Sequence, residues 1–301
     1  MRRLLFAILV VVGTTSCSGS PNNDTTTPTR RVECRESPTG PNTYRYAERS
    51  GSDPERTSLD VYLPATCGPA PVIVWVHGGG WRIGDKTNAV DGKVAVARDV
   101  GAALVAVNYR LSTPGSDVVW PDHGDDVAAA LLWIHDEGPG LGLEADRIAL
   151  LGHSAGGHLV SIVATDPDLL PRSDLVDCVV ALDTEGYDLA TSAAATTGLV
   201  ADAFGTDPAV VADASPIVQV ERHGAPDAEF LVVTRGTTRR RDAAQRFVDA
   251  VIDGGGTARL VDASPYSHAD VNRRLGEAGE SVVTPSVTEF LRSCTRSTAT
   301  G

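Results

Sequence analysis

The chain has 301 residues, of which 42% are hydrophobic, and its 39 acidic and 26 basic side chains leave a net charge of −13. This length suits one large α/β domain and is short for two. The negative charge argues against nucleic acid or an anionic membrane surface as a partner, because either would favour clustered lysine and arginine. The run from Arg239 to Arg241 is interpreted as a solvated loop or helix start.

Residues 1–16 have the pattern of an export signal: two arginines, an apolar stretch from Leu4 to Val12, and a small-residue cleavage site. The apolar stretch is too short to span a bilayer. Because Cys17 follows, the segment resembles a bacterial lipoprotein signal, in which this cysteine is acylated. We therefore expect a lipid anchor at Cys17, residues 17–33 as a flexible tether, and a location in the cell envelope, with plain secretion as the alternative.

Four further cysteines predict two disulfides in an exported protein, and three pairings of them are possible. Residues 44–49 and 58–63 are expected to form an antiparallel strand pair, with Cys34 and Cys67 at the same end of it. This favours Cys34–Cys67. The remaining bond, Cys178–Cys294, would join the start of a strand to the end of the last helix.

Beyond the strand pair, apolar β-rich runs alternate with amphipathic helical patterns. Strands are expected at residues 71–76, 103–108, 147–151, 178–182, 230–234 and 258–261, and helices at residues 88–100, 125–137, 155–165, 242–253 and 284–294. With the N-terminal antiparallel hairpin, this alternation predicts an α/β domain over residues 34–296. Its sheet would be eight-stranded, mostly parallel and doubly wound, with helices on both faces.

Two segments depart from the alternation. Residues 184–229 contain short helical pieces and several prolines between two strands, and are predicted to form a small cap over the strand ends. Residues 138–142 read Gly-Pro-Gly-Leu-Gly and are predicted to be a loop after a helix. Their spacing lacks the final glycine of a dinucleotide-binding site.

Residues with catalytic chemistry follow three of the predicted strands. Ser154 lies in a G-x-S-x-G pattern between a strand and a helix, which is the context of a strained nucleophile turn. The segment from His77 to Trp81 follows residues 71–76, and His268 follows residues 258–261. Because the carboxyl ends of parallel strands meet at one edge of a sheet, these groups are expected to converge there.

These motifs resemble the α/β-hydrolase superfamily, and within it HGGGW-type esterases that are BD-FAE-like or carboxylesterase-like. The resemblance covers residues 40–292 and rests on motifs that agree in order and spacing: His77-Gly78-Gly79-Gly80-Trp81, Asn108-Tyr109-Arg110-Leu111, Gly152 to Gly157 and Ser267-His268.

The resemblance implies that Ser154 is an acyl-transfer nucleophile and that His268 is the base that takes its proton. It places oxyanion donors at the backbone N–H of Ala155 and in the segment of Gly79 and Gly80, where the missing side chains let the backbone approach. Trp81 is expected either to line the acyl pocket or to pack in the core. No metal and no cofactor are implied.

The resemblance therefore predicts a serine carboxylic ester hydrolase, with a small-molecule or short-acyl ester as its partner. The alternatives are an arylformamidase or an acyltransferase on the same fold, or a non-catalytic binding lipoprotein.

The third member of the expected triad is missing from its usual place. In the resembled family an Asp stands three residues beyond a glycine such as Gly236, and here that position is Arg239. Asp183 ends the strand at residues 178–182 and projects at the catalytic edge, whereas Asp242 requires a rebuilt loop. We favour Asp183 as the acid that orients His268, with Asp242 as the alternative.

The other histidines are expected to have no catalytic role. His153 and His158 are expected to be packing or supporting residues, and His77 is expected to brace its loop by a hydrogen bond. A further three histidines are expected at the surface: His123, His135 and His223. The carboxylates around His123 are interpreted as helix-capping residues and not as a metal cluster.

Overall fold

The computed structural model describes residues 34–36, 38, 40–192 and 198–296. The predicted export signal at residues 1–16, Cys17 and the tether at residues 17–33 lie outside these residues, as does part of the predicted cap at residues 193–197. Within the part that is described, no helix is both long and apolar enough to cross a bilayer.

The centre of the domain is an eight-stranded sheet, as predicted, in the order β10-β9-β8-β7-β5-β6-β3-β2. The six strands β5 to β10 run parallel, and β3 and β2 are added in antiparallel pairings at one edge. The bounds are β2 Asn42–Arg45, β3 Ser58–Tyr62, β5 Ala70–Val76, β6 Ala103–Val107, β7 Leu143–His153, β8 Val176–Leu182, β9 Glu229–Thr234 and β10 Ala258–Asp262.

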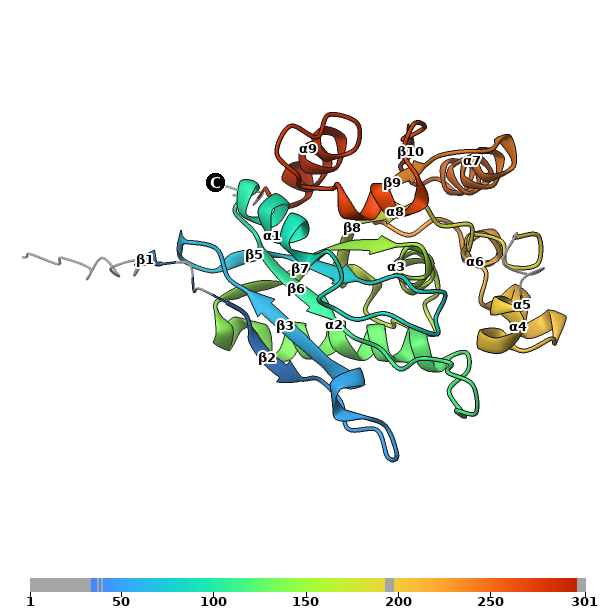
Figure 1. Cartoon of the computed structure of the whole chain (residues 1–301), viewed down its shortest axis with the longest axis horizontal. Helices are drawn as coiled ribbons and strands as arrows, with labels where there is room; N and C mark the ends of the chain where they lie inside the picture. The colour runs from blue at the N-terminus through green and yellow to red at the C-terminus, as the bar shows by residue number, and fades with distance from the viewer. Residues whose placement is uncertain (1–33, 37, 39, 193–197, 297–301) are drawn as a thin grey trace, which may run out of the picture. The chain divides into compact units, whose positions relative to one another are not determined.

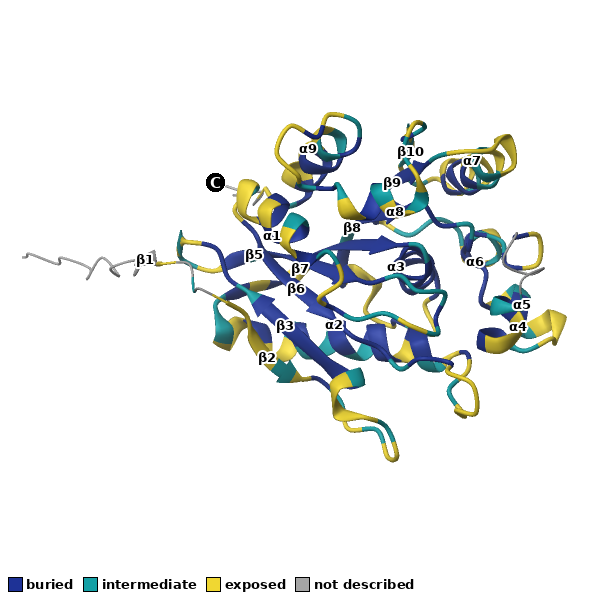
Figure 2. Ribbon diagram, in the orientation of Figure 1, coloured by how far each residue is buried: buried dark blue, intermediate teal, exposed yellow. Residues whose placement is uncertain are grey.

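Helices cover both faces of the sheet because the central strands are apolar on both sides (Figure 1). Val72, Val74 and Val76 of β5 pack toward α2, α3 and α7, whereas the alternate residues Ile73 and Trp75 pack toward α1, α8 and α9. Figure 2 shows these strands almost wholly buried. The helices are α1 Val90–Asp99, α2 Asp122–Leu141, α3 Ala155–Thr165, α7 Thr238–Asp253, α8 His268–Arg273 and α9 Thr284–Cys294, with short 3-10 helices at Pro54–Thr57 and Ser173–Leu175.

Three short helices, α4 Leu199–Phe204, α5 Pro208–Asp213 and α6 Pro216–His223, connect β8 to β9 within the segment predicted to be a cap. They join the core through buried side chains such as Val200, Phe204 and Val220. The cap segment is thus packed onto the same face of the sheet as α2 and α3.

The second predicted disulfide is present: Cys178 of β8 is bonded to Cys294 at the end of α9, 116 residues later. At the other predicted bond, β1 (Cys34–Arg35) pairs antiparallel with β4 (Thr66–Cys67), and Cys34 is the register partner of Cys67. Cys67 is disulfide-bonded. The side chain of Cys34 lies outside the described residues, so the pairing Cys34–Cys67 stays a prediction.

The predicted loop at residues 138–142 is wrong, because α2 continues through Gly138 and Pro139 to Leu141. Gly138 lets the last turn pack closely on β7, since a Cβ atom there would lie 3.0 Å from Cβ of Ala145. The helix ends instead at Gly142, which adopts a left-handed conformation with φ of 82° and donates its N–H to the last turn.

Candidate active site

Ser154 occupies a sharp turn between β7 and α3. Its φ of 56° and ψ of −119° are strained for a residue with a side chain. The flanking glycines are required by close backbone contacts, because a Cβ atom on Gly152 would lie 2.2 Å from the carbonyl oxygen of Gly156. A Cβ atom on Gly156 would lie 2.1 Å from the carbonyl oxygen of Val76 in β5. The turn therefore presents Oγ of Ser154 at the carboxyl edge of the sheet.

His268 lies between Ser154 and Asp183. Its Nε2 is 3.0 Å from Oγ of Ser154, and its Nδ1 is 2.6 Å from Oδ2 of Asp183. Ser267 holds this segment through a capping box with Asp270 at the start of α8. A proton on Nδ1, donated to the carboxylate, leaves Nε2 free to accept the hydroxyl proton of Ser154.

Asp183, and not Asp242, is the carboxylate that the structure places against His268. It follows β8 with a left-handed φ of 48°, its N–H donates to the carbonyl of Val233 at 2.7 Å, and its side chain is fully buried. Asp242 is exposed on α7. Of the two candidate acids, only Asp183 is therefore in contact with His268.

Two arginines also hold Asp183: Arg235, to which the sequence analysis gave no role, and Arg240, which it placed in a solvated run. The solvated interpretation is wrong for Arg240, because its side chain is only 17% exposed and bonds the buried carboxylate of Asp183. Arg235 donates from Nε to Oδ2 at 2.8 Å, and Arg240 donates from Nη2 to Oδ1 at 3.0 Å. Burial acts to raise the pKa of Asp183, but the hydrogen bond from His268, the charge of Arg240 and the hydrogen bond from Arg235 outweigh it, so this pKa lies below its usual value. The sequence held one sign of this arrangement: Arg239 stands where an acid was expected, and Arg235 and Arg240 lie near it in the chain.

A cavity of about 220 Å³ opens at the triad. It is lined by Ser154, His268, Asp183, Gly80, Trp81, Ala155, Thr184, Glu185, Gly186, Leu199 and Arg240. Gly80 and Ala155, two of the predicted oxyanion residues, thus share the cavity with the serine. Gly79 is not among the lining residues; with φ of 127° it forms the preceding turn, where a Cβ atom would lie 1.9 Å from the carbonyl oxygen of Ile83.

Trp81 combines the two roles that were expected of it as alternatives. It lines the cavity but is only 4% exposed, and its indole packs edge-on against Phe204 of the cap with ring centroids 4.9 Å apart. Its Nε1 donates to Nδ1 of His158 at 3.2 Å, and Nε2 of His158 donates to the carbonyl of Ala214 at 2.8 Å. Trp81 and His158 therefore connect the glycine-rich loop to the cap.

His153 and His77 support the site from beneath. Nε2 of His153 donates to the carbonyl of His268 at 3.0 Å, and burial, together with the nearby His268, lowers the pKa of His153 to about 3. Nδ1 of His77 donates to the carbonyl of Gly78 at 2.7 Å, and burial lowers the pKa of His77 to about 4. Both rings are neutral at physiological pH.

The expectation that His123 lies at the surface is wrong. It is fully buried at the start of α2, with Nε2 2.9 Å from Oγ of Ser112, and burial lowers its pKa to about 4. The reason is tertiary, because the cap covers this end of α2: the N–H of Trp120 donates to the carbonyl of Ala203 at 2.7 Å. Of the other two histidines expected at the surface, His223 is exposed and His135 is partly buried.

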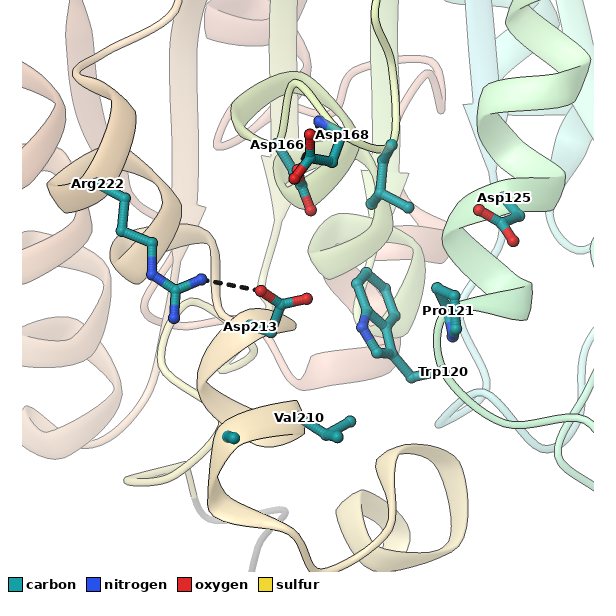
Figure 3. Close-up of a pocket in the computed structure, with 10 residues that line it drawn as sticks. Trp120, Pro121, Asp125, Asp166, Asp168, Val210, Asp213 and Arg222 are labelled. Atoms are coloured by element: carbon teal, nitrogen blue, oxygen red, sulfur yellow. Dashed lines mark hydrogen bonds and ion pairs between the residues drawn. The ribbon is translucent and has the colours of Figure 1, made fainter.

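A larger cavity of about 630 Å³ lies apart from the triad (Figure 3). It is lined by residues from the start of α2, the end of α3 and the cap: Trp120, Pro121, Asp125, Asp166, Asp168, Leu169, Ala209, Val210, Asp213 and Arg222. Arg222 and Asp213 form an ion pair at 2.8 Å. None of Ser154, His268 and Asp183 lines this cavity, so its size does not make it the reactive site.

Histidine, cysteine, aspartate and glutamate side chains form no group suited to a metal ion within the described ranges. The expectation that the carboxylates near His123 cap the helix is wrong, because α2 has Pro121 as its N-cap residue and no side chain caps its N-terminus. These carboxylates bond other groups. Both oxygens of Asp126 accept hydrogen bonds from Arg110, at 2.7 and 2.9 Å, and Asp122 accepts the N–H of Val119 at 3.2 Å.

Relatives of this chain among known proteins include some that are named as esterases or carboxylic ester hydrolases. Residues 59–170 match the model of the BD-FAE family. A probable carboxylic ester hydrolase, LipM, of Mycobacterium tuberculosis is 39% identical over 101 residues, which are 34% of this chain and 23% of LipM. The carboxylesterase NlhH of the same species is 40% identical over 96 residues, which are 31% of this chain and 28% of NlhH. The chain thus spans about a quarter of the length of these relatives.

Solved structures match over a longer stretch. Esterase B from Lactobacillus rhamnosis has a TM-score of 0.67 and 25% identity, and the match covers 87% of each chain. A thermostable esterase from Pseudomonas putida has a TM-score of 0.67 and 20% identity, covering 86% of this chain and 84% of that one. The chain thus has an α/β-hydrolase fold, and its residues 59–170 match the BD-FAE family model.

Proposed function

We propose that the chain is a serine carboxylic ester hydrolase that forms an acyl-enzyme on Ser154. The observation that carries the proposal is the continuous contact from Oγ of Ser154 through His268 to the buried carboxylate of Asp183. The names of the relatives, which are carboxylic ester hydrolases and esterases, support the same class of reaction.

In the first step Oγ of Ser154 attacks the ester carbonyl carbon while Nε2 of His268 takes the hydroxyl proton. The tetrahedral oxyanion is stabilised by backbone N–H groups of Ala155 and of the segment that includes Gly80. The C–O bond to the alcohol then breaks, and His268 returns the proton to the leaving oxygen. In the second half of the reaction His268 takes a proton from water, which attacks the acyl carbon; the bond to Oγ of Ser154 breaks, and His268 returns the proton to Oγ.

The substrate is proposed to be a small or short-acyl ester. The cavity at the triad, about 220 Å³, is small compared with the usual size of sites for drug-sized ligands. Trp81 and Leu199 supply its apolar part, and the packing of Trp81 against His158 and Phe204 holds the wall in place. A long acyl chain would require the cap to move.

The test is hydrolysis of p-nitrophenyl esters with acyl chains of 2, 4, 8 and 12 carbons, together with labelling by a fluorophosphonate. We expect the 2- and 4-carbon esters to have the highest kcat/KM, and Ser154→Ala to abolish both turnover and labelling. A folded protein that neither turns over these esters nor is labelled would contradict the proposal and favour a binding role. Faster turnover of an N-formyl arylamide, or acyl transfer to an added alcohol in preference to water, would favour the two related activities.

We also propose that the protein is exported and anchored by a lipid on Cys17. The sequence of residues 1–17 supports this proposal, and the disulfide Cys178–Cys294 is consistent with an oxidising compartment. Expression of the full chain and of Cys17→Ser should separate the two modes of export. The native chain is expected in the membrane fraction and the variant in the soluble one; equal distributions would contradict the anchor.

A further inference from the structure

Two arginines that follow β9, where the resembled family carries its acid, bond the carboxylate of Asp183 after β8. Arg235 lies in the loop after β9, and Arg240 lies in the first turn of α7. Arg235 bonds Oδ2 of Asp183, the same oxygen that receives the N–H of His268. Arg240 bonds Oδ1 at 3.0 Å and the main-chain carbonyl of Asp183 at 3.1 Å, and its Nη1 bonds Glu185 at 2.6 Å. The four charges of Asp183, Arg235, Arg240 and Glu185 sum to zero.

Asp183 needs these partners for a physical reason. Its carboxylate has no exposed surface, and its backbone has a left-handed φ of 48°. A buried carboxylate without partners takes up a proton, and a neutral acid no longer stabilises the imidazolium that forms when His268 accepts the proton of Ser154. Arg240 donates hydrogen bonds to both the side chain and the main chain of Asp183. It therefore fixes the carboxylate within hydrogen-bonding distance of Nδ1 of His268.

Arg235 has a second effect because it shares one oxygen with His268. The negative charge of Asp183 favours the protonated form of His268, and the positive charge of Arg235 on the same carboxylate oxygen opposes this effect. A protonated His268 cannot act as a base. Without Arg235, the ring would hold its proton more firmly and lose base function at a higher pH. The charge of Arg240 has less influence on His268, because Glu185 offsets it.

We propose that Arg235 and Arg240 are positioning residues for the reaction of Ser154, and that Arg235 extends activity to more acidic pH. The proposal rests on the proposed ester hydrolase function and deepens it.

The other titratable or charged groups packed around His268 are left unchanged by the test. They are His153 of β7, whose ring centroid is 4.5 Å from that of His268, Lys93 of α1, which bonds Asn272 of α8, and Asp270 and Arg273 of α8 itself.

The experiment measures kcat/KM for p-nitrophenyl acetate from pH 4.5 to 9 in the full chain and in matched variants. Arg235→Gln should move the acid limb of the profile up by about 0.5–1 pH unit, with a plateau within about tenfold of the native value. Arg235→Lys keeps the charge and should keep the native limb. Arg240→Gln should lower the kcat plateau by about 10–100-fold with a smaller movement of the limb.

Arg241→Gln is the control, because it removes the same charge from the same part of the chain, next to Arg240 in α7, while Arg241 contacts only Asp262 among the charged groups described. It should reproduce the native profile. If the limb of Arg235→Gln coincides with that of Arg241→Gln, or if Arg235→Gln lowers kcat/KM by one factor at all pH values, the role given to Arg235 is wrong. A kcat for Arg240→Gln within twofold of the native value would exclude its positioning role.

Two measures keep the test decisive. Arg235→Met is a second neutral variant; failure of Arg235→Gln, Arg235→Met and Arg235→Lys alike to fold would contradict the proposal by making Arg235 purely structural. If the native chain hydrolyses no ester, the proposed function fails, and NMR of the His268 ring replaces the rate assay. Protonation at a higher pH in Arg235→Gln than in the native chain would support the electrostatic role of Arg235, and identical titrations would contradict it.

Discussion

Replacing Asp183 by Asn should nearly abolish catalysis and leave the domain folded. The carboxylate oxygens accept from Arg235 and His268 on one side and from Arg240 on the other. An amide has one oxygen, so its NH₂ group must face a donor. If the NH₂ lies at the Oδ2 position, Nδ1 of His268 must accept, which puts the proton on Nε2 and blocks transfer from Ser154. If it lies at the Oδ1 position, it faces Arg240, and the negative charge is lost in either case.

The expected loss in kcat is about 10²–10⁴-fold, or roughly 3–5 kcal/mol of transition-state stabilisation. The assay is p-nitrophenyl acetate hydrolysis at pH 7.5, with circular dichroism and thermal unfolding to establish that each variant is folded. Asp242→Asn is the matched control, because Asp242 is exposed on α7, and its kcat should stay within about twofold of the native value. A folded Asp183→Asn variant within tenfold of native, or a large loss in Asp242→Asn, would refute this assignment of the acid.

Three further predictions concern stability. Hydrogen bonds from Thr284 and from the N–H groups of Val282 and Val283 outweigh the opposing effect of burial and lower the pKa of Glu280 to about 2. Glu280→Gln should therefore lower the free energy of unfolding, measured by urea titration, by about 1–2 kcal/mol at pH 7. This difference from the native chain should disappear as pH falls from about 4 to 2. A difference that stays constant with pH would contradict the stabilising role of the Glu280 charge. Removing the 116-residue cross-link with Cys178→Ala/Cys294→Ala should cost about 2–5 kcal/mol in the same assay, and an unchanged midpoint would argue against the bond. Burial lowers the pKa of Lys93 to about 7, so above pH 7 the unfolded chain binds more protons than the native one. Between pH 7 and 9 the free energy of unfolding of the native chain should therefore rise by about 1–2 kcal/mol more than that of Lys93→Met. If the free energies of the two proteins change equally with pH, Lys93 is not responsible.

Several features of the fold and of the site could be predicted from residues that are close together in the sequence. Runs such as residues 71–76 are apolar at every position, which only a strand covered on both faces can satisfy, so the parallel sheet and its helices followed from the pattern. The turn at Ser154 could also be predicted from local sequence, because close backbone contacts, within a few residues or with the adjacent strand, require glycine at positions 152 and 156. The helix at residues 138–141 was missed because Gly138 and Pro139 break helices on average, and packing of Gly138 on β7 overrides that preference.

The sequence by itself determined the order of strands and helices and the edge at which Ser154 and His268 meet, because these depend on periodicity and on the common direction of parallel strands. It favoured the pairing of Cys178 with Cys294 among three possibilities, and the structure contains that bond. Only the tertiary structure decided which carboxylate contacts His268. Asp183 lies 85 residues from His268 and reaches it at 2.6 Å through the pairing of β8 with β9 and β9 with β10. Its charge is tolerated there because Arg235 and Arg240 arrive from a third segment, and no local pattern records a balance of charges assembled from three parts of the chain.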